Sequence, residues 1–164
     1  MSQLEGKVAI VTGAARGLGR AYAEAMAREG AAIFACDINS CDDTVAAIEA
    51  AGGRAVGAVT DITSMASCTA MAEQAVRSFG RIDVLVNNAI WVKYEPMAEV
   101  QEDVYRRQMA IGVDAVYWGI QAVTPHMLAR GAGSIVNMTS PASVHGIPNG
   151  SVYAAVKGAI SALT

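Results

Sequence analysis

Short apolar runs alternate with longer amphipathic segments along most of the chain. Five runs rich in Val, Ile and Ala have the length and composition of buried β-strands, and they lie at residues 8–11, 32–37, 55–60, 82–86 and 134–138. The segments between them have helical periodicity, which predicts helices over residues 20–29, 42–51 and 64–79. Ser64 is a suitable N-cap for the third of these helices, and Gly30 and Gly80 are placed to end the first and the third.

Residues 100–130 are predicted to form one long helix between the last two strands. Apolar residues form a continuous stripe along it, at Met109, Val113, Val116, Ile120, Val123 and Met127. A second stripe on another side contains Ile111, Ala115, Trp118 and Ala122. The first stripe can cover the sheet, whereas the second needs another partner, because large apolar patches on soluble proteins mark interaction sites. We therefore expect a homo-oligomer that assembles through helix 100–130.

The order of these elements predicts the fold class. Strands and helices alternate without hairpin signals, which indicates right-handed βαβ units. We expect an α/β fold, a Rossmann-type doubly wound parallel sheet with the strand order 3-2-1-4-5. Because the chain has 164 residues and no internal repeat or linker, residues 1–164 are expected to form a single domain.

Composition argues against several classes of function. Charged residues make up 16% of the chain and hydrophobic residues 53%, a balance that excludes disorder and suits a sheet covered on both faces. The net charge of −3 and the 5% of aromatic residues give no reason to expect nucleic acid as a partner. His126 and His145 lack the spacing of metal ligands, so no metal site is expected.

The cysteines and the apolar stretches predict where the protein resides. Cys36, Cys41 and Cys68 form no CxxC pair, and their odd number argues against a disulfide framework. The first residues lack the basic start and the apolar stretch of a signal peptide. The longest nearly apolar stretch, residues 109–128, contains Asp114, whose charge would be costly inside a bilayer. We expect a cytoplasmic protein with no membrane partner.

A glycine-rich turn follows the first strand. Residues 12–19 read Thr-Gly-Ala-Ala-Arg-Gly-Leu-Gly, and a predicted helix comes next. Glycines in such a turn let the backbone approach a ligand closely, while the N–H groups of the helix point at a pyrophosphate. No Gly-Lys-Ser/Thr sequence follows, which excludes a Walker A loop. The turn predicts a dinucleotide site formed by Gly13, Arg16, Gly17, Leu18 and Gly19.

Asp37, at the end of the second strand, indicates which dinucleotide is bound. It lies 18 residues after Gly19, where a carboxylate can accept hydrogen bonds from the adenosine ribose and would repel a 2′-phosphate. Arg16 is the only nearby basic residue that could hold such a phosphate. NAD is therefore favoured over NADP as the cofactor. The alternative is that Asp37 only caps the turn that follows it.

Tyr153 and Lys157 are four residues apart on a predicted helix, so the phenol and the ammonium lie on the same face. This spacing also arises by chance, and an ordinary pair on a helix surface is the alternative. Ser140 lies 13 residues before Tyr153, just past the last strand. The same edge of the sheet holds the glycine-rich turn and Asp37, and open α/β sheets bind their ligands at this edge.

These motifs, in this order and spacing, resemble the short-chain dehydrogenase/reductase family. The resemblance rests on the glycine-rich turn at 12–19, Asn87-Asn88-Ala89, Ser140 and Tyr153-x-x-x-Lys157, and it runs through the whole chain. It implies an oxidoreductase that transfers a hydride between NAD(H) and a small-molecule secondary alcohol or ketone.

The resemblance also implies a role for each matching residue. Tyr153 would be the general acid/base, and Ser140 would hydrogen-bond the substrate oxygen. Lys157 would bind the nicotinamide ribose and favour the tyrosinate form of its neighbour. The remaining cofactor contacts would be Asp61 and Ile62 at the adenine and Asn88 and Ala89 beside the cofactor.

The chain departs from the family pattern at three places. Ile90 follows Asn-Asn-Ala where many members have Gly, which puts β-branched bulk near the nicotinamide. Gly112 stands where many members have an Asn that helps to hold a water for proton relay, so that role is not carried over. The chain stops at Thr164, within the helix that carries Tyr153 and Lys157, and we therefore expect a fragment of a longer polypeptide whose later strands are absent.

Two other functions stay open. The chain could be a dinucleotide-binding module without turnover, or an inactive fragment of such an enzyme. It could also be an interaction protein that uses the exposed face of helix 100–130. Binding of NAD without alcohol oxidation would favour the first, and concentration-dependent association without such binding would favour the second.

Overall fold

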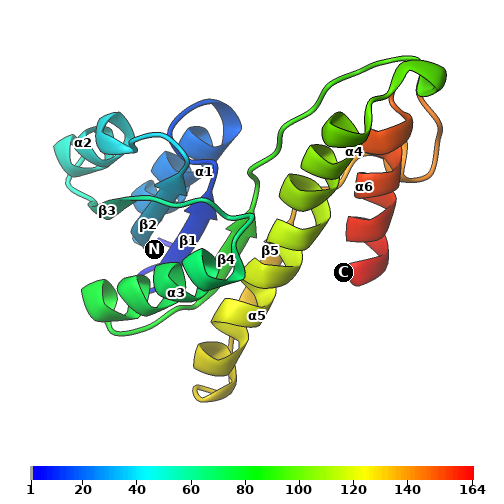
Figure 1. Ribbon diagram of the computed structural model, residues 1–164. Helices are drawn as coiled ribbons and strands as arrows, with labels where there is room; N and C mark the ends of the chain where they lie inside the picture. The colour runs from blue at the N-terminus through cyan, green and yellow to red at the C-terminus, as the bar shows by residue number, and fades with distance from the viewer. Residues whose placement is uncertain (1) are drawn as a thin grey trace.

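Five parallel strands form the centre of the computed structural model, which describes residues 2–164 (Figure 1). The strands are β1 (Val8–Thr12), β2 (Ala32–Asp37), β3 (Arg54–Val59), β4 (Val84–Asn87) and β5 (Ser134–Asn137). They pair in the order β3-β2-β1-β4-β5. The predicted doubly wound sheet and its strand order are therefore confirmed, and each strand lies within two residues of its predicted run.

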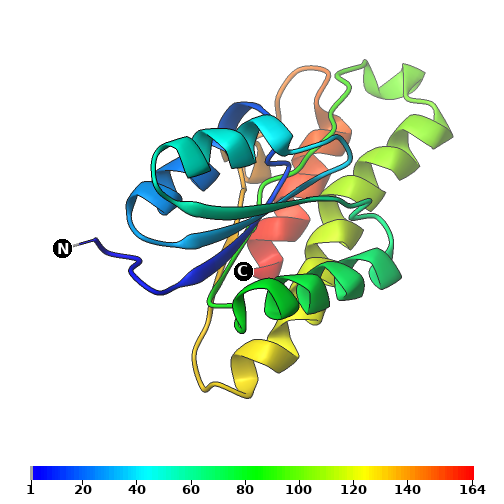
Figure 2. The same cartoon turned by 90° about the vertical axis from the view of Figure 1, so that its left-hand side faces the viewer.

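Helices cover both faces of the sheet. Helices α1 (Gly17–Arg28) and α2 (Asp42–Ala50) pack on one face, against Ala9 and Val11 of β1. Helices α3 (Met65–Phe79) and α5 (Ala115–Leu128) pack on the other face, against Ile10 of the same strand. The central strands β1 and β2 are buried on both sides, which explains why their sequences read as continuous apolar runs rather than as an alternation. Figure 2 shows the layers from the side.

The ends of the helices follow from local chemistry. Helix α3 begins after Ser64, whose Oγ accepts a hydrogen bond from the Ser67 N–H at 3.3 Å. It ends at Gly80, which has φ 79°, a left-handed conformation that glycine adopts without steric cost. Gly30 follows α1 with φ 92° and is held by its N–H bond to Ala27 O. All three predicted helix ends are confirmed.

The predicted helix over residues 100–130 is wrong in one respect, because it is not one regular α-helix. Helix α4 (Glu102–Met109) and helix α5 are joined by a π-helical turn, η2 (Ala110–Asp114). Within this turn the Ala115 N–H donates to Ala110 O, five residues back, instead of to the carbonyl four residues back. Gly112 lies in the middle of the widened turn and is buried.

The two apolar stripes of this segment have different partners. Val123 and Met127 of the first stripe pack against the sheet, while Val116 packs against the last helix, α6 (Ser151–Leu163). In the second stripe, Ala122 packs against the buried apolar cluster that includes Met71 and Ala75 of α3. Part of the second stripe is thus covered within the chain, and the second subunit expected there stays a prediction.

Two short 3₁₀ turns complete the description, η1 (Met97–Glu99) before α4 and η3 (Pro141–Ser143) after β5. Helix α6 lies alongside α4 and η2 in both ribbon views. Among residues 2–164, no helix combines the length and the apolar composition that crossing a bilayer requires. The carboxyl ends of the strands point toward the region between α1 and α4 (Figure 1).

Candidate active site

The glycine-rich turn after β1 is shaped by two close approaches. Gly13 has φ 68°, and a Cβ added to it would lie 2.8 Å from Ala89 Cα, so no larger residue fits. A Cβ on Gly19 would lie 2.6 Å from Asn88 Nδ2 and would also overlap the carbonyl of Gly13. These glycines let the segment that follows β4 press directly against the turn. Gly13 and Gly19, which were predicted to form a tight turn, therefore both occupy positions where a side chain would not fit.

Thr12 and Asn88 hold the turn in this position. The Thr12 hydroxyl accepts hydrogen bonds from the N–H groups of Asn88 and Ala89 at 3.0 and 3.1 Å, and it donates to Val86 O at 3.3 Å. The Asn88 side-chain amide donates in return to Thr12 O at 2.9 Å. Asn88 was predicted to lie beside the cofactor, and the structure adds that it ties the end of β4 to the turn. Thr12 itself was given no role in the sequence analysis.

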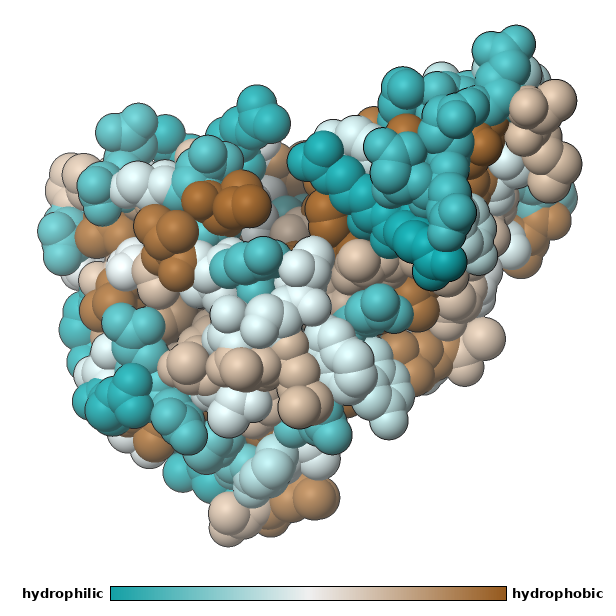
Figure 3. Space-filling view, in the orientation of Figure 1, coloured by the Kyte–Doolittle hydropathy of each residue, from teal (hydrophilic) through white to brown (hydrophobic). Residues whose placement is uncertain are grey.

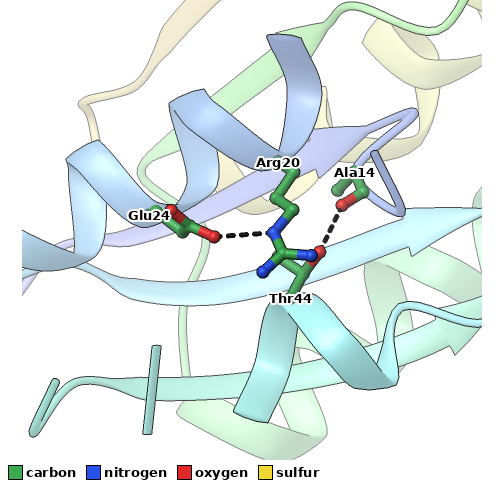
Figure 4. Close-up of polar contacts among 4 residues, drawn as sticks. All are labelled: Ala14, Arg20, Glu24 and Thr44. Atoms are coloured by element: carbon green, nitrogen blue, oxygen red, sulfur yellow. Dashed lines mark hydrogen bonds and ion pairs between the residues drawn. The ribbon is translucent and has the colours of Figure 1, made fainter. Parts of the chain in front are cut away.

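Helix α2 supports the turn from behind. Thr44, which is fully buried, donates its hydroxyl hydrogen to Ala14 O at 2.8 Å (Figure 4). On α1, Arg20 forms an ion pair with Glu24, with 2.7 Å between Nε and Oε1. The guanidinium of Arg20 is therefore already paired, whereas Arg16, the N-cap residue of α1, borders the cleft described next.

A cavity of about 520 Å³ opens at the carboxyl edge of the sheet, within the range typical of ligand sites. Figure 3 shows the hollow between the part of the surface over α1 and α2 and the arm that α4 forms. Of the cofactor-binding residues predicted from the sequence, ten line this cavity: Gly13, Arg16, Gly17, Leu18, Gly19, Asp37, Asp61, Ile62, Asn88 and Ala89. Residues from four separate segments of the chain are thus brought together in one cleft.

Asp37 lies at the wall of the cleft and is held there by backbone groups. Its Oδ2 accepts from the Ala15 N–H at 3.2 Å, and its Oδ1 accepts from the Asn39 N–H at 3.0 Å. The second of these bonds is the turn-capping contact that was the alternative reading of this residue. The first links the carboxylate to the glycine-rich turn, so Asp37 both caps the turn and faces the cleft.

Tyr153 and Lys157 lie close together on α6, as their spacing predicts. Lys157 is only 5% exposed, and burial lowers the pKa of its ammonium group. The ammonium donates to Met138 O and lies 5.8 Å from the centroid of the Tyr153 ring. The Tyr153 ring also makes an edge-to-face contact with Tyr94, with centroids 5.8 Å apart.

Ser140 follows β5 and has a local partner. Its Oγ accepts from the Ala142 N–H at 3.2 Å, so the side chain caps η3. Among residues 2–164, the walls of the 520 Å³ cavity do not include Ser140, Tyr153 or Lys157. Two hydrogen bonds still link Lys157 to the cleft. The Lys157 ammonium donates to Met138 O, and the Met138 N–H donates to the carbonyl of Asn87 at 3.2 Å, which is next to Asn88 of the cleft wall.

The structure also places residues at the cleft that the sequence analysis did not assign to it. Arg107 of α4 lines the cavity, and its guanidinium lies 4.1 Å from the ring centroid of Trp91, a cation–π contact. The two residues are 16 positions apart, so no local spacing could have indicated their contact. Within residues 2–164, no group of three or more His, Cys, Asp or Glu side chains is arranged to hold a metal ion.

Comparison with known proteins decides the family. Residues 7–164 match the sequence profile of the short chain dehydrogenase family. The chain belongs to this family. The resemblance expected from the motifs is thereby confirmed over nearly the whole length of this short-chain dehydrogenase.

Relatives and solved structures extend this result. The chain is 40% identical to the sorbitol dehydrogenase of Cereibacter sphaeroides over 163 residues, which cover 99% of the chain and 63% of that protein. A crystal structure of NAD⁺-bound xylitol dehydrogenase matches with a TM-score of 0.93 and 36% identity, covering 99% of this chain and 64% of that one.

The carveol dehydrogenase of Mycobacterium avium, solved in complex with NAD, matches with a TM-score of 0.95 and 28% identity. That match covers 99% of this chain and 65% of the other. This short-chain dehydrogenase chain thus spans less than two thirds of the length of each of the three proteins. The two solved structures share a bound NAD, and both proteins are named as dehydrogenases.

Proposed function

We propose that this protein is an NAD(H)-dependent dehydrogenase that interconverts a secondary alcohol and the corresponding ketone. The observation that carries the proposal is the buried ammonium of Lys157 beside Tyr153, at the same edge of the sheet as the cleft of about 520 Å³. The names of the sorbitol, xylitol and carveol dehydrogenases support an alcohol as the class of substrate.

The cleft suits the cofactor at its phosphate end. The first turn of α1 contains no acidic residue, and Arg16 at its N-cap makes no capping hydrogen bond through its side chain. The N–H groups of this turn are therefore available to the oxygens of a pyrophosphate. Gly17, with φ 59° and no atom within 4 Å of an added Cβ, leaves open space in front of them.

The ribose end supports NAD rather than NADP. The carboxylate of Asp37 can accept hydrogen bonds from two free ribose hydroxyls, and its charge repels a 2′-phosphate. The next residues along the chain, Ile38 and Asn39, also line the cleft and carry no positive charge. Arg16 also lines the cleft, and its place at the start of α1 suits the pyrophosphate better than the ribose.

Tyr153 is the residue to which we assign proton transfer. Bound NAD supplies the hydride acceptor, and its reduced form supplies the donor. A phenol in water ionises at about pH 10, so it needs a neighbouring cation to act as a base near neutral pH. Lys157 provides that cation. The Tyr153 oxygen would take the hydroxyl proton of the alcohol and return it in the reverse direction, while Ser140 would donate a hydrogen bond to the substrate oxygen.

Substitution of the acid/base tests this proposal. We expect Tyr153→Phe to abolish alcohol-dependent formation of NADH, because the ring stays and only the proton-carrying oxygen is lost. The dissociation constant for NAD, measured by NADH fluorescence competition, should change by less than about twofold. Tyr105→Phe on the exposed side of α4 is the matched control and should keep full activity. A Tyr153→Phe protein that still oxidises the alcohol would remove Tyr153 from the mechanism.

A module that binds the dinucleotide without turnover is the second candidate function. It is favoured by one observation, namely that the position matched by a relay Asn in the family is occupied by Gly112. This candidate predicts NAD binding to the purified protein with no NADH formation from any secondary alcohol, including sorbitol and xylitol.

We further propose that residues 1–164 act as one dinucleotide-binding domain that assembles with a second copy through α5. Tyr117 and Leu128 on that helix are 50% and 74% exposed, which suits an apolar contact between subunits. Sedimentation equilibrium of the wild type and of a Leu128→Glu variant tests the contact. We expect the wild type to sediment as an oligomer and the variant as a monomer.

A further inference from the structure

The π-helical turn η2 lies directly against α6. Gly112, in the middle of this turn, is buried, and its Cα faces Val156 of α6. A Cβ added to Gly112 would overlap Val156 Cγ1 and would lie 3.2 and 3.3 Å from Cγ2 and Cβ of the same residue. The valine side chain thus occupies the space that any side chain at position 112 would need.

Val156 cannot easily move out of this space. It is 2% exposed and belongs to a buried cluster with Val116 and Ile160. A β-branched side chain on a helix has one strongly preferred rotamer, so rotation about χ1 costs energy. Rotation would also bring another part of the side chain toward Gly112, because all three side-chain carbons of Val156 already lie within 3.3 Å of a Cβ added there. A larger residue at 112 must therefore displace the helix rather than the side chain.

The displaced helix is the one that carries the proposed acid/base. Val156 lies between Tyr153 and Lys157 in α6. Lys157 is fixed by its hydrogen bond to Met138 O, next to the end of β5, so a shift of α6 away from η2 would lengthen or break that bond. In enzymes, a misplacement of about 1 Å can lower the rate by about 100-fold.

We infer that Gly112 is a positioning residue: the absence of a side chain in η2 lets Val156 pack closely, so that α6 holds Tyr153 and Lys157 at the carboxyl edge of the sheet. The inference rests on the proposed function for its kinetic consequence, but the contact itself does not. The two residues form a matched pair, and removing volume from Val156 should offset the addition of volume at Gly112.

A kinetic cycle in the full-length protein tests the pair. We expect Gly112→Ala to lower kcat by about 10- to 100-fold and to leave the Kd of NAD within about threefold, since Gly112 does not line the cleft. Adding Val156→Ala should restore kcat to within about threefold of the Val156→Ala single variant. Gly158→Ala is the matched control, because this glycine adjoins Lys157 in α6 and an added Cβ would meet only Ser143 O, at 3.7 Å.

Chemical labelling follows the position of Lys157 without relying on turnover. Acetylation by an N-hydroxysuccinimide ester is quantified by peptide mass spectrometry, with exposed Lys7 as the internal reference. Gly112→Ala should raise the labelling of Lys157 by about fivefold or more, and the double variant should return it to the level of Val156→Ala. The control Gly158→Ala should label like the wild type.

The outcomes separate the two proposals. Unchanged labelling and kcat in Gly112→Ala, or no reversal in the double variant, would overturn the positioning role of Gly112. A wild type that binds NAD and oxidises no alcohol would refute the proposed function alone, and the labelling cycle would still decide the role of Gly112. If Gly112→Ala fails to fold by circular dichroism, a folded double variant with a protected Lys157 supports the matched pair, and a double variant that also fails to fold contradicts it.

Discussion

Replacement of Thr12 by valine removes the hydroxyl that joins β1 to the end of β4 while keeping the shape of the side chain. Thr12 is 3% exposed and accepts hydrogen bonds from the N–H groups of Asn88 and Ala89 at 3.0 and 3.1 Å. Valine cannot accept either bond, so two backbone donors would lose their partner. Thr12→Val is therefore expected to loosen the contact between the glycine-rich turn and the segment that follows β4.

The size of the effect follows from the burial of the two donors. A buried donor left without a partner costs about 1–3 kcal/mol, so two such donors give an upper limit of about 6 kcal/mol. Asn88 and Ala89 are only half-buried at the wall of the cleft, where water can replace part of each bond. We therefore expect Thr12→Val to lower the free energy of unfolding by about 2–3 kcal/mol. The Kd of NAD should rise by about tenfold, since the disturbed turn lines the cleft that we propose for the cofactor.

Urea unfolding followed by circular dichroism measures the first quantity, and fluorescence titration with NADH measures the second. Thr12→Ser is the matched control, because it keeps the hydroxyl and removes only a methyl group; its unfolding free energy should stay closer to the wild type than that of Thr12→Val. A Thr12→Val protein within about 0.5 kcal/mol of the wild type would show that the hydroxyl does not hold the two segments together. A serine variant as destabilised as the valine variant would attribute the effect to packing instead.

Because of the charge of Asp37, we expect Asp37→Asn to weaken NAD binding and to raise the ratio of NADP affinity to NAD affinity by about tenfold. Titration with both cofactors measures this ratio. An unchanged ratio would show that Asp37 does not discriminate between them. Burial lowers the pKa of Lys157 below its usual value of 10.5. Between the lowered pKa and 10.5, Lys157 is protonated in the unfolded chain but not in the folded protein, so its contribution to the free energy of unfolding should rise with pH. Burial raises the pKa of Cys41 and Cys68 to about 11, which opposes this rise because the unfolded thiols ionise first. The thiol contribution is the same in the wild type and in Lys157→Met, so it cancels in the difference between their urea midpoints. A difference that does not change with pH would contradict the lowered pKa of Lys157.

The central strands could be predicted from the sequence because β1 is buried throughout and β2 is buried up to its last residue. Residues 32–37 of β2 are apolar up to Asp37, and all but that last residue are buried, so composition alone marks the strand. The strand ends at Asp37, the residue for which we propose contact with the adenosine ribose. The glycine-rich turn could be predicted for a related reason, since Gly13 and Gly19 occupy positions where the backbone of another segment leaves no space for a Cβ.

The π-helical turn could not be predicted from periodicity. The apolar stripe through Met109, Val113 and Val116 keeps the spacing of an α-helix, and residues four apart stay on nearly the same side of a slightly wider turn. One widened turn therefore leaves no trace in a pattern of apolar positions. The partners of the stripe were also hidden, because Val116 faces α6 while Val123 faces the sheet, and the sequence gives both the same apolar character.

The proposed catalytic pair, Tyr153 and Lys157, illustrates how far a local pattern reaches. Tyr153 and Lys157 could be identified because four residues on one helix fix their relative position. The contact between Gly112 and Val156 joins positions 44 residues apart, and only the packing of η2 on α6 brings them together. In the sequence, glycine at 112 reads as the loss of a polar side chain. In the structure the space is filled by valine from the opposite helix, so the substitution at one position has to be judged together with the volume at the other.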